Sequence, residues 1–218
     1  MTDQLSGADA RLDPDVLLNY PPSRGGNAVL HLGGGAVLRS GTVIYGGSTI
    51  GAGLQTGHHV VVREECEIGD DVSIWSNTVV DYGCRVGHRV KIHSNCYVAQ
   101  YTEIGDDAFL APGVTIANDL YPGNEKSAQH MSGPSIGSGA QIGVNVTILP
   151  FVRIGPGSLI GAGSVVTRDI PAGSVAFGNP ARLTGEVDAL RDIASRVAQQ
   201  DSTPRFRFDD ETEKRIRP

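Results

Sequence analysis

The sequence predicts an all-β fold, a parallel β-helix of about seven triangular coils, and three observations lead to this prediction. Aliphatic residues recur every six positions over most of the chain. The position four residues after each of them is mostly small or β-branched. Glycine supplies 29 of the 218 residues, which suits a chain that turns at short intervals. Short strands joined by two-residue corners explain this pattern, because three such hexads close one triangular coil.

The six-residue period runs from Leu32 to Ile116 and resumes from Ile136 to Val166. Of the 21 positions in this series 20 are aliphatic, and only Thr56 departs from the pattern. An apolar content of 39% would place about eight apolar residues there by chance. Stacked coils lie about 4.8 Å apart, so residues 18 apart in the sequence are expected to lie above one another.

The three cysteines, Cys66, Cys84 and Cys96, all fall in the small position of the repeat. They lack CxxC spacing, and an odd number of cysteines argues against a disulfide framework. We expect them to point into the prism as small apolar side chains, where burial raises the pKa of a thiol and suppresses its reactivity.

The same period predicts how the chain is organised. Residues 1–27 are predicted to form an extended N-terminal arm, and residues 28–182 the β-helix. Residues 117–135 interrupt the period and are expected to leave the prism as a loop, either a functional element or a disordered insertion. Residues 183–218 are predicted to contain a C-terminal helix and a tail, because apolar residues from Val187 onward recur at helical spacing.

Charge and hydropathy exclude several classes of partner. A formal net charge of -6 provides no general attraction to nucleic acid or to anionic lipid. No segment approaches the roughly 18 consecutive apolar residues of a membrane span, and the first residues lack the basic and apolar pattern of a secretory signal. These features predict a cytoplasmic protein that binds neither nucleic acid nor membrane.

One corner of the predicted prism gathers side chains that suit proton transfer. The spacing of 18 places His93 above Trp75, with His58, His59 and Asn95 on the same corner. His93 is the best candidate for a general base, because the ordinary pKa of histidine lies near neutrality; a solvated corner histidine is the alternative. Asn95 occupies a position where the corner favours positive φ, which also explains an asparagine structurally. Which of the three histidines acts depends on how subunits dock.

From about Gly41 to Arg182 the chain resembles the hexapeptide-repeat acyltransferases. The loop sequence NDLYP, the segment IGAGSVVT and the turn GNPAR make it similar to those members that N-acetylate nucleotide-linked amino sugars. The resemblance implies a left-handed β-helix, a hand that does not follow from the usual right-handed crossover rule. It also implies a homotrimer with sites between subunits, acetyl-CoA as co-substrate and no metal.

The resemblance further assigns roles to particular residues. It maps the acceptor site onto His93, Asn95, Asn118 and Asp119. It maps the coenzyme contacts onto Gly161, Ala162, Asn179, Pro180 and Arg182, with Arg168 or Arg182 placed to meet phosphate. The GAG and GNPAR segments also fit an ordinary corner and an ordinary turn, which is the competing explanation.

The residues so assigned imply direct transfer without an acyl-enzyme. The amine of a bound sugar would attack the thioester carbonyl while His93, or a water held by Asn95, removes a proton. Backbone or asparagine N–H groups would stabilise the oxyanion. Asp119 would pair with the ammonium group of the acceptor or orient a base.

Three other functions stay open on the sequence. One is an O-acetyltransferase that acts on serine, a simple sugar or an antibiotic. A second is a γ-carbonic-anhydrase-like zinc enzyme, which the fragments DVSIW and GHRVKIH resemble; His88 and His93 match two ligand positions, but Ala52 stands at the third. The third is a non-catalytic β-helix scaffold, since a fold does not fix a chemistry. The sequence identifies neither the sugar and nucleotide nor the acyl chain length.

Overall fold

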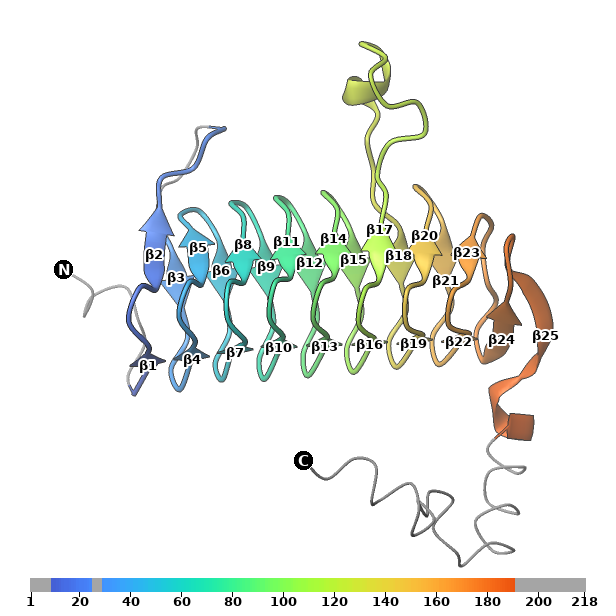
Figure 1. Ribbon diagram of the computed structural model, residues 1–218, viewed down its shortest axis with the longest axis horizontal. Helices are drawn as coiled ribbons and strands as arrows, with labels where there is room; N and C mark the ends of the chain where they lie inside the picture. Colours follow the sequence, from blue (N-terminus) through green and yellow to red (C-terminus); the bar gives the residue numbers. More distant parts are fainter. Residues whose placement is uncertain (1–8, 25–28, 191–218) are drawn as a thin grey trace, which may run out of the picture.

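The computed structural model describes residues 9–24 and 29–190. They form a straight three-sided prism whose coils stack along one axis, and the loop of residues 117–134 stands away from it (Figure 1). Three sheets, here named A, B and C, make up the three faces. Almost every strand is only two residues long, because each face of the prism is one hexad wide.

All pairings between neighbouring coils are parallel. Sheet A runs in the order β21 (Arg153–Ile154), β18 (Ser135–Ile136), β15 (Glu103–Ile104), β12 (Arg85–Val86), β9 (Glu67–Ile68), β6 (Thr49–Ile50) and β3 (His31–Leu32). Sheet B runs in the order β1 (Arg11–Leu12), β4 (Val37–Leu38), β7 (Gln55–Thr56), β10 (Ser73–Ile74), β13 (Lys91–Ile92), β16 (Phe109–Leu110), β19 (Gln141–Ile142), β22 (Leu159–Ile160), β24 (Ser174–Phe177) and β25 (Arg182–Glu186). Sheet C runs in the order β2 (Leu17–Tyr20), β5 (Val43–Tyr45), β8 (Val61–Val62), β11 (Val79–Val80), β14 (Tyr97–Val98), β17 (Thr115–Ile116), β20 (Thr147–Ile148) and β23 (Val165–Val166).

Two of the three corners matter for function. The chain passes from sheet B to sheet C at the BC corner, which comprises residues 39–42, 57–60, 75–78, 93–96, 111–114, 143–146 and 161–164. It passes from sheet C to sheet A at the CA corner, which comprises residues 46–48, 63–66, 81–84, 99–102, 117–134 and 149–152. Sheet C therefore lies between these two corners, and each corner is one of its edges.

The aliphatic period fills the inside of the prism as predicted. Ile74, Ile92 and Leu110 pair in register across neighbouring coils of sheet B and are fully buried. Cys66, Cys84 and Cys96 are buried free thiols. Burial raises the pKa of Cys96, so little reactive thiolate forms near neutral pH. The inward positions of the repeat thus serve packing.

The N-terminal residues depart from the prediction. β1 and β2 lie within the predicted arm of residues 1–27, yet they pair with β4 and β5 as a further coil. Leu12 aligns with Leu38, a separation of 26 residues, whereas one coil takes 18. The eight extra residues between β2 and β3 interrupt the six-residue step, and the sequence period therefore begins only at Leu32. The prism has about eight coils, one more than predicted.

The C-terminal segment also differs from the prediction, in its first residues. The prediction placed a helix and tail over residues 183–218, but β25 covers Arg182–Glu186 and pairs antiparallel with β24. This pairing covers the edge strand of sheet B, which would otherwise expose unpaired backbone groups. Residues 187–190 are helical, with Val187 buried, and the rest of the predicted helix and tail lies outside the described residues.

The interrupted period at residues 117–135 is a loop on the CA corner. The chain leaves the prism after β17 and returns at β18, which begins at Ser135 (Figure 1). A short 3-10 helix, η2 (Ser127–Gln129), lies within it. Ile136 aligns with Ile104, so the coil resumes in register after the excursion. None of the described helices is long and apolar enough to cross a membrane.

Candidate active site

His93 lies on the BC corner in the middle of an aromatic stack. Its ring is parallel to that of Trp75, with 4.2 Å between centroids, and Phe109 packs on it at 4.9 Å. The backbone is fixed as well, because the carbonyl of His93 accepts a hydrogen bond from Thr78 Oγ1. The side chain is half-buried. A histidine held in this way retains one defined ring plane, which suits directed proton transfer.

Asn95 lies two residues further along the same corner and is exposed, with φ of 61°. Asn77, directly below it, has φ of 59°. The positive φ was predicted, and it gives both asparagines a structural reason to be there. His58 and His59 lie further along this corner, with ring centroids 6.5 Å apart.

Asn118 and Asp119 lie at the base of the loop, on the CA corner. Asn118 Nδ2 donates to Gln100 Oε1 at 2.5 Å, and the Asn118 carbonyl accepts from the amide of Ser132, where the loop returns to the prism. Asp119 Oδ1 accepts from the amide of Tyr121 and from the hydroxyl of Ser127. Both side chains therefore hold the loop in shape while remaining partly accessible.

The four predicted acceptor-site residues are thus split within one chain. His93 and Asn95 lie on the BC corner, whereas Asn118 and Asp119 lie on the CA corner, at the opposite edge of sheet C. The single chain brings each pair together, but it does not bring the two pairs together.

Most of the predicted coenzyme contacts share the BC corner with His93. Gly161 and Ala162 belong to the corner three coils beyond His93, about 14 Å along the axis. The turn that contains Asn179 and Pro180, joined by a cis peptide bond, folds back onto this corner. It is tied there by a hydrogen bond from the amide of Val165 to the Gly178 carbonyl.

The remaining predicted contacts are divided between two places. Arg182 follows the turn and is exposed, and its Nη1 donates to the carbonyl of Ala181. Arg168 follows β23 toward the CA corner, away from the others. A Cβ on Gly161 would lie 2.7 Å from Cβ of Phe177, so close packing by itself explains that glycine.

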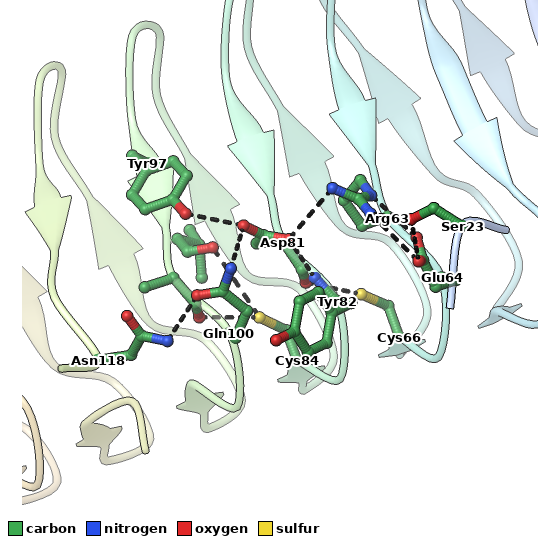
Figure 2. Close-up of polar contacts among 12 residues, drawn as sticks. Ser23, Arg63, Glu64, Cys66, Asp81, Tyr82, Cys84, Tyr97, Gln100 and Asn118 are labelled. Atoms are coloured by element: carbon green, nitrogen blue, oxygen red, sulfur yellow. Dashed lines mark hydrogen bonds and ion pairs between the residues drawn. The ribbon is translucent and has the colours of Figure 1, made fainter. Parts of the chain in front are cut away.

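A chain of polar contacts along the CA corner had not been predicted (Figure 2). Its centre is Asp81, which is 6% exposed. Oδ2 of Asp81 accepts from the hydroxyl of Tyr97 at 2.7 Å and from Nε2 of Gln100 at 2.6 Å. Oδ1 accepts from the amide of Tyr82 at 2.8 Å. Gln100 continues the chain to Asn118, so the carboxylate is connected to the base of the loop.

The chain extends in the other direction to a second buried carboxylate, Glu64. Arg63 donates from Nε and Nη2 to Glu64 and lies 3.8 Å from Asp81 Oδ1. The hydroxyl of Ser23 also donates to Glu64. Burial raises the pKa of Glu64, but the hydrogen bonds and charge of Arg63, a backbone amide and the hydroxyl of Ser23 together outweigh it and hold this pKa at about 2.

This pKa predicts a pH dependence of stability. A carboxylate whose pKa is lowered by folding stabilises the folded state above its ordinary pKa of 4.5, and that contribution is lost as the pH falls toward 2. The free energy of unfolding should therefore be lower for Glu64→Gln than for the unsubstituted protein at pH 7. Urea denaturation should find that this difference shrinks between pH 4.5 and 2.5; a constant difference would contradict the assignment.

The sequence did contain a signal for this chain of contacts. Glu64, Tyr82, Gln100 and Asn118 are spaced by 18 residues and so form one column of the CA corner. The columns that contain the three candidate histidines lie on the BC corner and do not include these residues. Each polar residue taken singly is ordinary, and only the stacked column identifies them as a group.

The structure also separates the residues of the zinc hypothesis. His88 lies on the corner between sheets A and B, whereas His93 lies on the BC corner. Nδ1 of His88 accepts a hydrogen bond from the amide of Asp70. Within residues 9–24 and 29–190, no three His, Cys, Asp or Glu side chains gather in a way that could hold a metal ion.

A cavity of about 320 Å³ lies between the loop and the next turn of the CA corner. Its lining includes Leu120, Tyr121, Lys126, His130 and Phe151. The loop therefore adds a partly aromatic hollow to the corner that carries Asn118.

The fold and the repeat agree with one family of known proteins. The family model for the bacterial transferase hexapeptide (six repeats) matches residues 47–81, 83–118 and 133–168. The chain belongs to the hexapeptide-repeat family of left-handed β-helix transferases. The matched residues include both the BC and CA corners around His93 and Asn118.

Curated relatives of this hexapeptide-repeat protein are named acetyltransferases. It is 38% identical over 109 residues to a serine acetyltransferase of Arabidopsis thaliana, and the alignment covers 50% of this chain and 28% of the relative. It is 43% identical over 96 residues to the galactoside O-acetyltransferase of Escherichia coli, which covers 42% of this chain and 47% of the relative. The chain thus spans less than half the length of either relative.

Among solved structures, a UDP-N-acetylglucosamine acyltransferase from Bacteroides fragilis has a TM-score of 0.62 and 19% identity. The alignment covers 94% of this chain and 92% of that one. At this level of identity the likeness establishes the shared left-handed β-helix.

Proposed function

We propose that this protein is an acetyl-CoA-dependent acetyltransferase that acts on the amino group of a nucleotide-linked amino sugar, at sites between the subunits of a cytoplasmic homotrimer. The observation that carries the proposal is that the predicted site residues lie at two opposite edges of sheet C. Neither edge is a complete site, and a neighbouring subunit supplies what is missing.

The outer face of sheet C supports self-association. Its outward-facing column is apolar or uncharged along the whole prism, comprising Leu17, Val43, Val61, Val79, Tyr97, Thr115, Thr147 and Val165. The corresponding column of sheet A contains Glu67, Arg85, Glu103 and Arg153, joined in part by ion pairs. A long uncharged and largely apolar column is typical of a face that is covered in an assembly.

A threefold rotation about an axis parallel to the prism places the BC corner of one subunit beside the CA corner of another. If each subunit turns sheet C toward this axis, its BC corner lies next to the CA corner of the following subunit. Such a rotation does not shift a residue along the axis. His93 of one subunit and Asn118 of the next then differ in height by one coil, about 5 Å.

The chemistry at this junction is direct transfer. The acceptor nitrogen forms a bond to the thioester carbonyl carbon, and His93 takes the proton that the nitrogen loses. The tetrahedral intermediate then collapses, the carbon–sulfur bond breaks, and the thiolate of coenzyme A leaves and is protonated. Gly161, Ala162, Asn179, Pro180 and Arg182, on the same corner as His93, hold the coenzyme, and Arg168 of the neighbouring subunit lies on the facing corner.

An O-acetyltransferase is the second candidate, and the name of one relative favours it. The galactoside enzyme is named an O-acetyltransferase, whereas the name of the serine acetyltransferase gives an acceptor that carries both a hydroxyl and an amine. A hydroxyl must lose its proton as it attacks, so this reaction depends on the base more strongly than the reaction of a neutral amine does.

The experiment that tests the proposal is release of free thiol from acetyl-CoA by the purified protein. The acceptors are nucleotide-linked amino sugars, the same sugars without the amine, serine and galactosides. Turnover confined to the amino sugars supports N-acetylation, turnover with hydroxyl acceptors supports the second candidate, and no thiol release with any acceptor contradicts both.

A charge on sheet C should separate the subunits. Val79→Arg places a cation in the middle of the apolar column, so we expect a monomer by light scattering and a loss of thiol release, with an unchanged circular dichroism spectrum. The control is Thr49→Arg, which places the same charge on sheet A. A Val79→Arg protein that stays trimeric and active would show that another face joins the subunits.

A further inference from the structure

The polar chain on the CA corner begins at a buried carboxylate and ends at Asn118, in the proposed acceptor site (Figure 2). Hydrogen bonds between amides have a direction, because the oxygen only accepts and the nitrogen only donates. The donor-to-acceptor direction along these hydrogen bonds therefore decides which atom of Asn118 the acceptor substrate meets. The inference drawn from it rests on the proposed function.

Asp81 sets the direction at its start. The ionised carboxylate has no proton to donate, so each partner must donate to it. The hydroxyl of Tyr97 does so, and burial together with this bond raises the pKa of Tyr97 and keeps the hydroxyl protonated. Gln100 is left with one orientation, in which Nε2 faces Asp81 at 2.6 Å.

Gln100 passes the direction on to Asn118. With Nε2 turned to Asp81, Oε1 faces the loop, and it accepts from Asn118 Nδ2 at 2.5 Å. The same Nδ2 contacts Sδ of Met131. Asn118 Oδ1 points away from Gln100 in Figure 2, and it accepts no hydrogen bond from any residue in the described ranges. Because no buried side-chain nitrogen or oxygen there lacks a partner, this oxygen is accessible to a ligand.

We propose that Asp81 is a positioning residue, which acts through Gln100 to present Asn118 Oδ1 as a hydrogen-bond acceptor to the N–H group of the acceptor substrate. This oxygen can accept a hydrogen bond from an amine or a hydroxyl of the substrate. It disfavours substrates that present only a lone pair, and no N–H or O–H group, at this position. Asp81 itself is buried and does not touch the substrate.

The isosteric change Asp81→Asn reverses the hydrogen bonds of the polar chain, and the hydroxyl of Tyr97, which donates to Asp81, then accepts from the new Nδ2 instead. Nδ2 of the new asparagine donates to Gln100 Oε1, Gln100 turns its Nε2 toward Asn118 Oδ1, and Asn118 then presents Nδ2 to the substrate. We expect kcat/KM for the acceptor to fall about tenfold or more, as for the loss of one substrate hydrogen bond. The KM for acetyl-CoA should stay unchanged.

The double variant Asp81→Asn with Gln100→Glu restores the direction. The carboxylate at position 100 accepts both from the new asparagine and from Asn118 Nδ2, so Asn118 Oδ1 again faces the substrate. We expect this variant to recover kcat/KM for the acceptor to within about threefold of the unsubstituted protein. A residue that merely stabilised the fold would give no such recovery.

The matched control is Asp106→Asn. Asp106 is a partly exposed aspartate on the corner between sheets A and B, and its Oδ1 accepts a hydrogen bond from the amide of His88. It should leave kcat/KM unchanged. Gln100→Met serves if Asp81→Asn fails to fold, and it should reproduce the tenfold loss. The proposal is overturned if Asp81→Asn keeps kcat/KM within twofold, or if the double variant is no more active than the single one.

A second readout separates failure of this proposal from failure of the proposed function. Side-chain NH2 signals of Asn118, assigned by their loss in Asn118→Ala, report its hydrogen bond by NMR without any turnover. They should shift in Asp81→Asn and return in the double variant. If the unsubstituted protein releases no thiol, the proposed function fails while these signals still decide the orientation; unchanged signals in Asp81→Asn would overturn the proposal.

Discussion

Replacing His93 by alanine is expected to lower kcat for acetyl transfer by a factor of about 10² to 10⁴, the range typical of a lost general base. The aromatic stack with Trp75 and Phe109 fixes the imidazole but does not need its nitrogens, so the fold should tolerate the change. The KM for acetyl-CoA should change little, because the proposed coenzyme contacts at Gly161 and Ala162 lie three coils away. Steady-state thiol release with saturating acetyl-CoA measures both constants.

His31→Ala is the matched control for this variant, since His31 is exposed on sheet A near the N-terminal end of the prism. It should retain full activity. If a higher pH restores the kcat of His93→Ala with an amine acceptor, the role of His93 is to deprotonate the amine. A variant with full activity would move the base to His58 or His59 on the same corner.

The inward positions were predictable because burial alone determines them. Ile92 and Cys96 point into the prism whatever the protein does, and the six-residue period records that requirement directly. The contact of His93 with Trp75 was predictable for the same reason, since a constant coil length converts a spacing of 18 into a vertical stack.

The N-terminal coil escaped prediction because an insertion moves the register without weakening the packing. Leu12 and Leu18 align with Leu38 and Ile44 as well as any later pair does. A period counted backward from Leu32 nevertheless meets no branched aliphatic residue, because it falls on Gly26, Tyr20, Pro14 and Ala8. The handedness also came from the resemblance to a family and not from the period.

The polar chain on the CA corner was missed because polar residues on a corner usually face solvent. Asp81 and Glu64 are instead 6% and 1% exposed, and only their partners make this burial favourable. Those partners come from three coils and from Ser23 before the second coil, so no short sequence motif contains them.

The proposed division of the site between subunits predicts that two impaired variants restore activity to each other. His93→Ala and Asn118→Ala chains, mixed in equal amounts and refolded or expressed together, form trimers of random composition. A site is complete when the chain that supplies its BC corner carries the intact histidine and the chain that supplies its CA corner carries the intact asparagine. About one quarter of the sites meet both conditions, so the mixture should regain about a quarter of the original thiol release.

The controls distinguish this arrangement from a site within one chain. Mixing the two folded variants without subunit exchange should restore nothing. A mixture of unsubstituted chains with the double variant His93→Ala, Asn118→Ala should show about a quarter of full activity if sites are shared, and about half if each chain holds its own site. Two results together would contradict a shared site: no activity from the mixture of the two single variants, and half activity from the mixture with the double variant. Because sheet C keeps the BC and CA corners of one chain apart, His93 and Asn118 would then act at different places and not in one site.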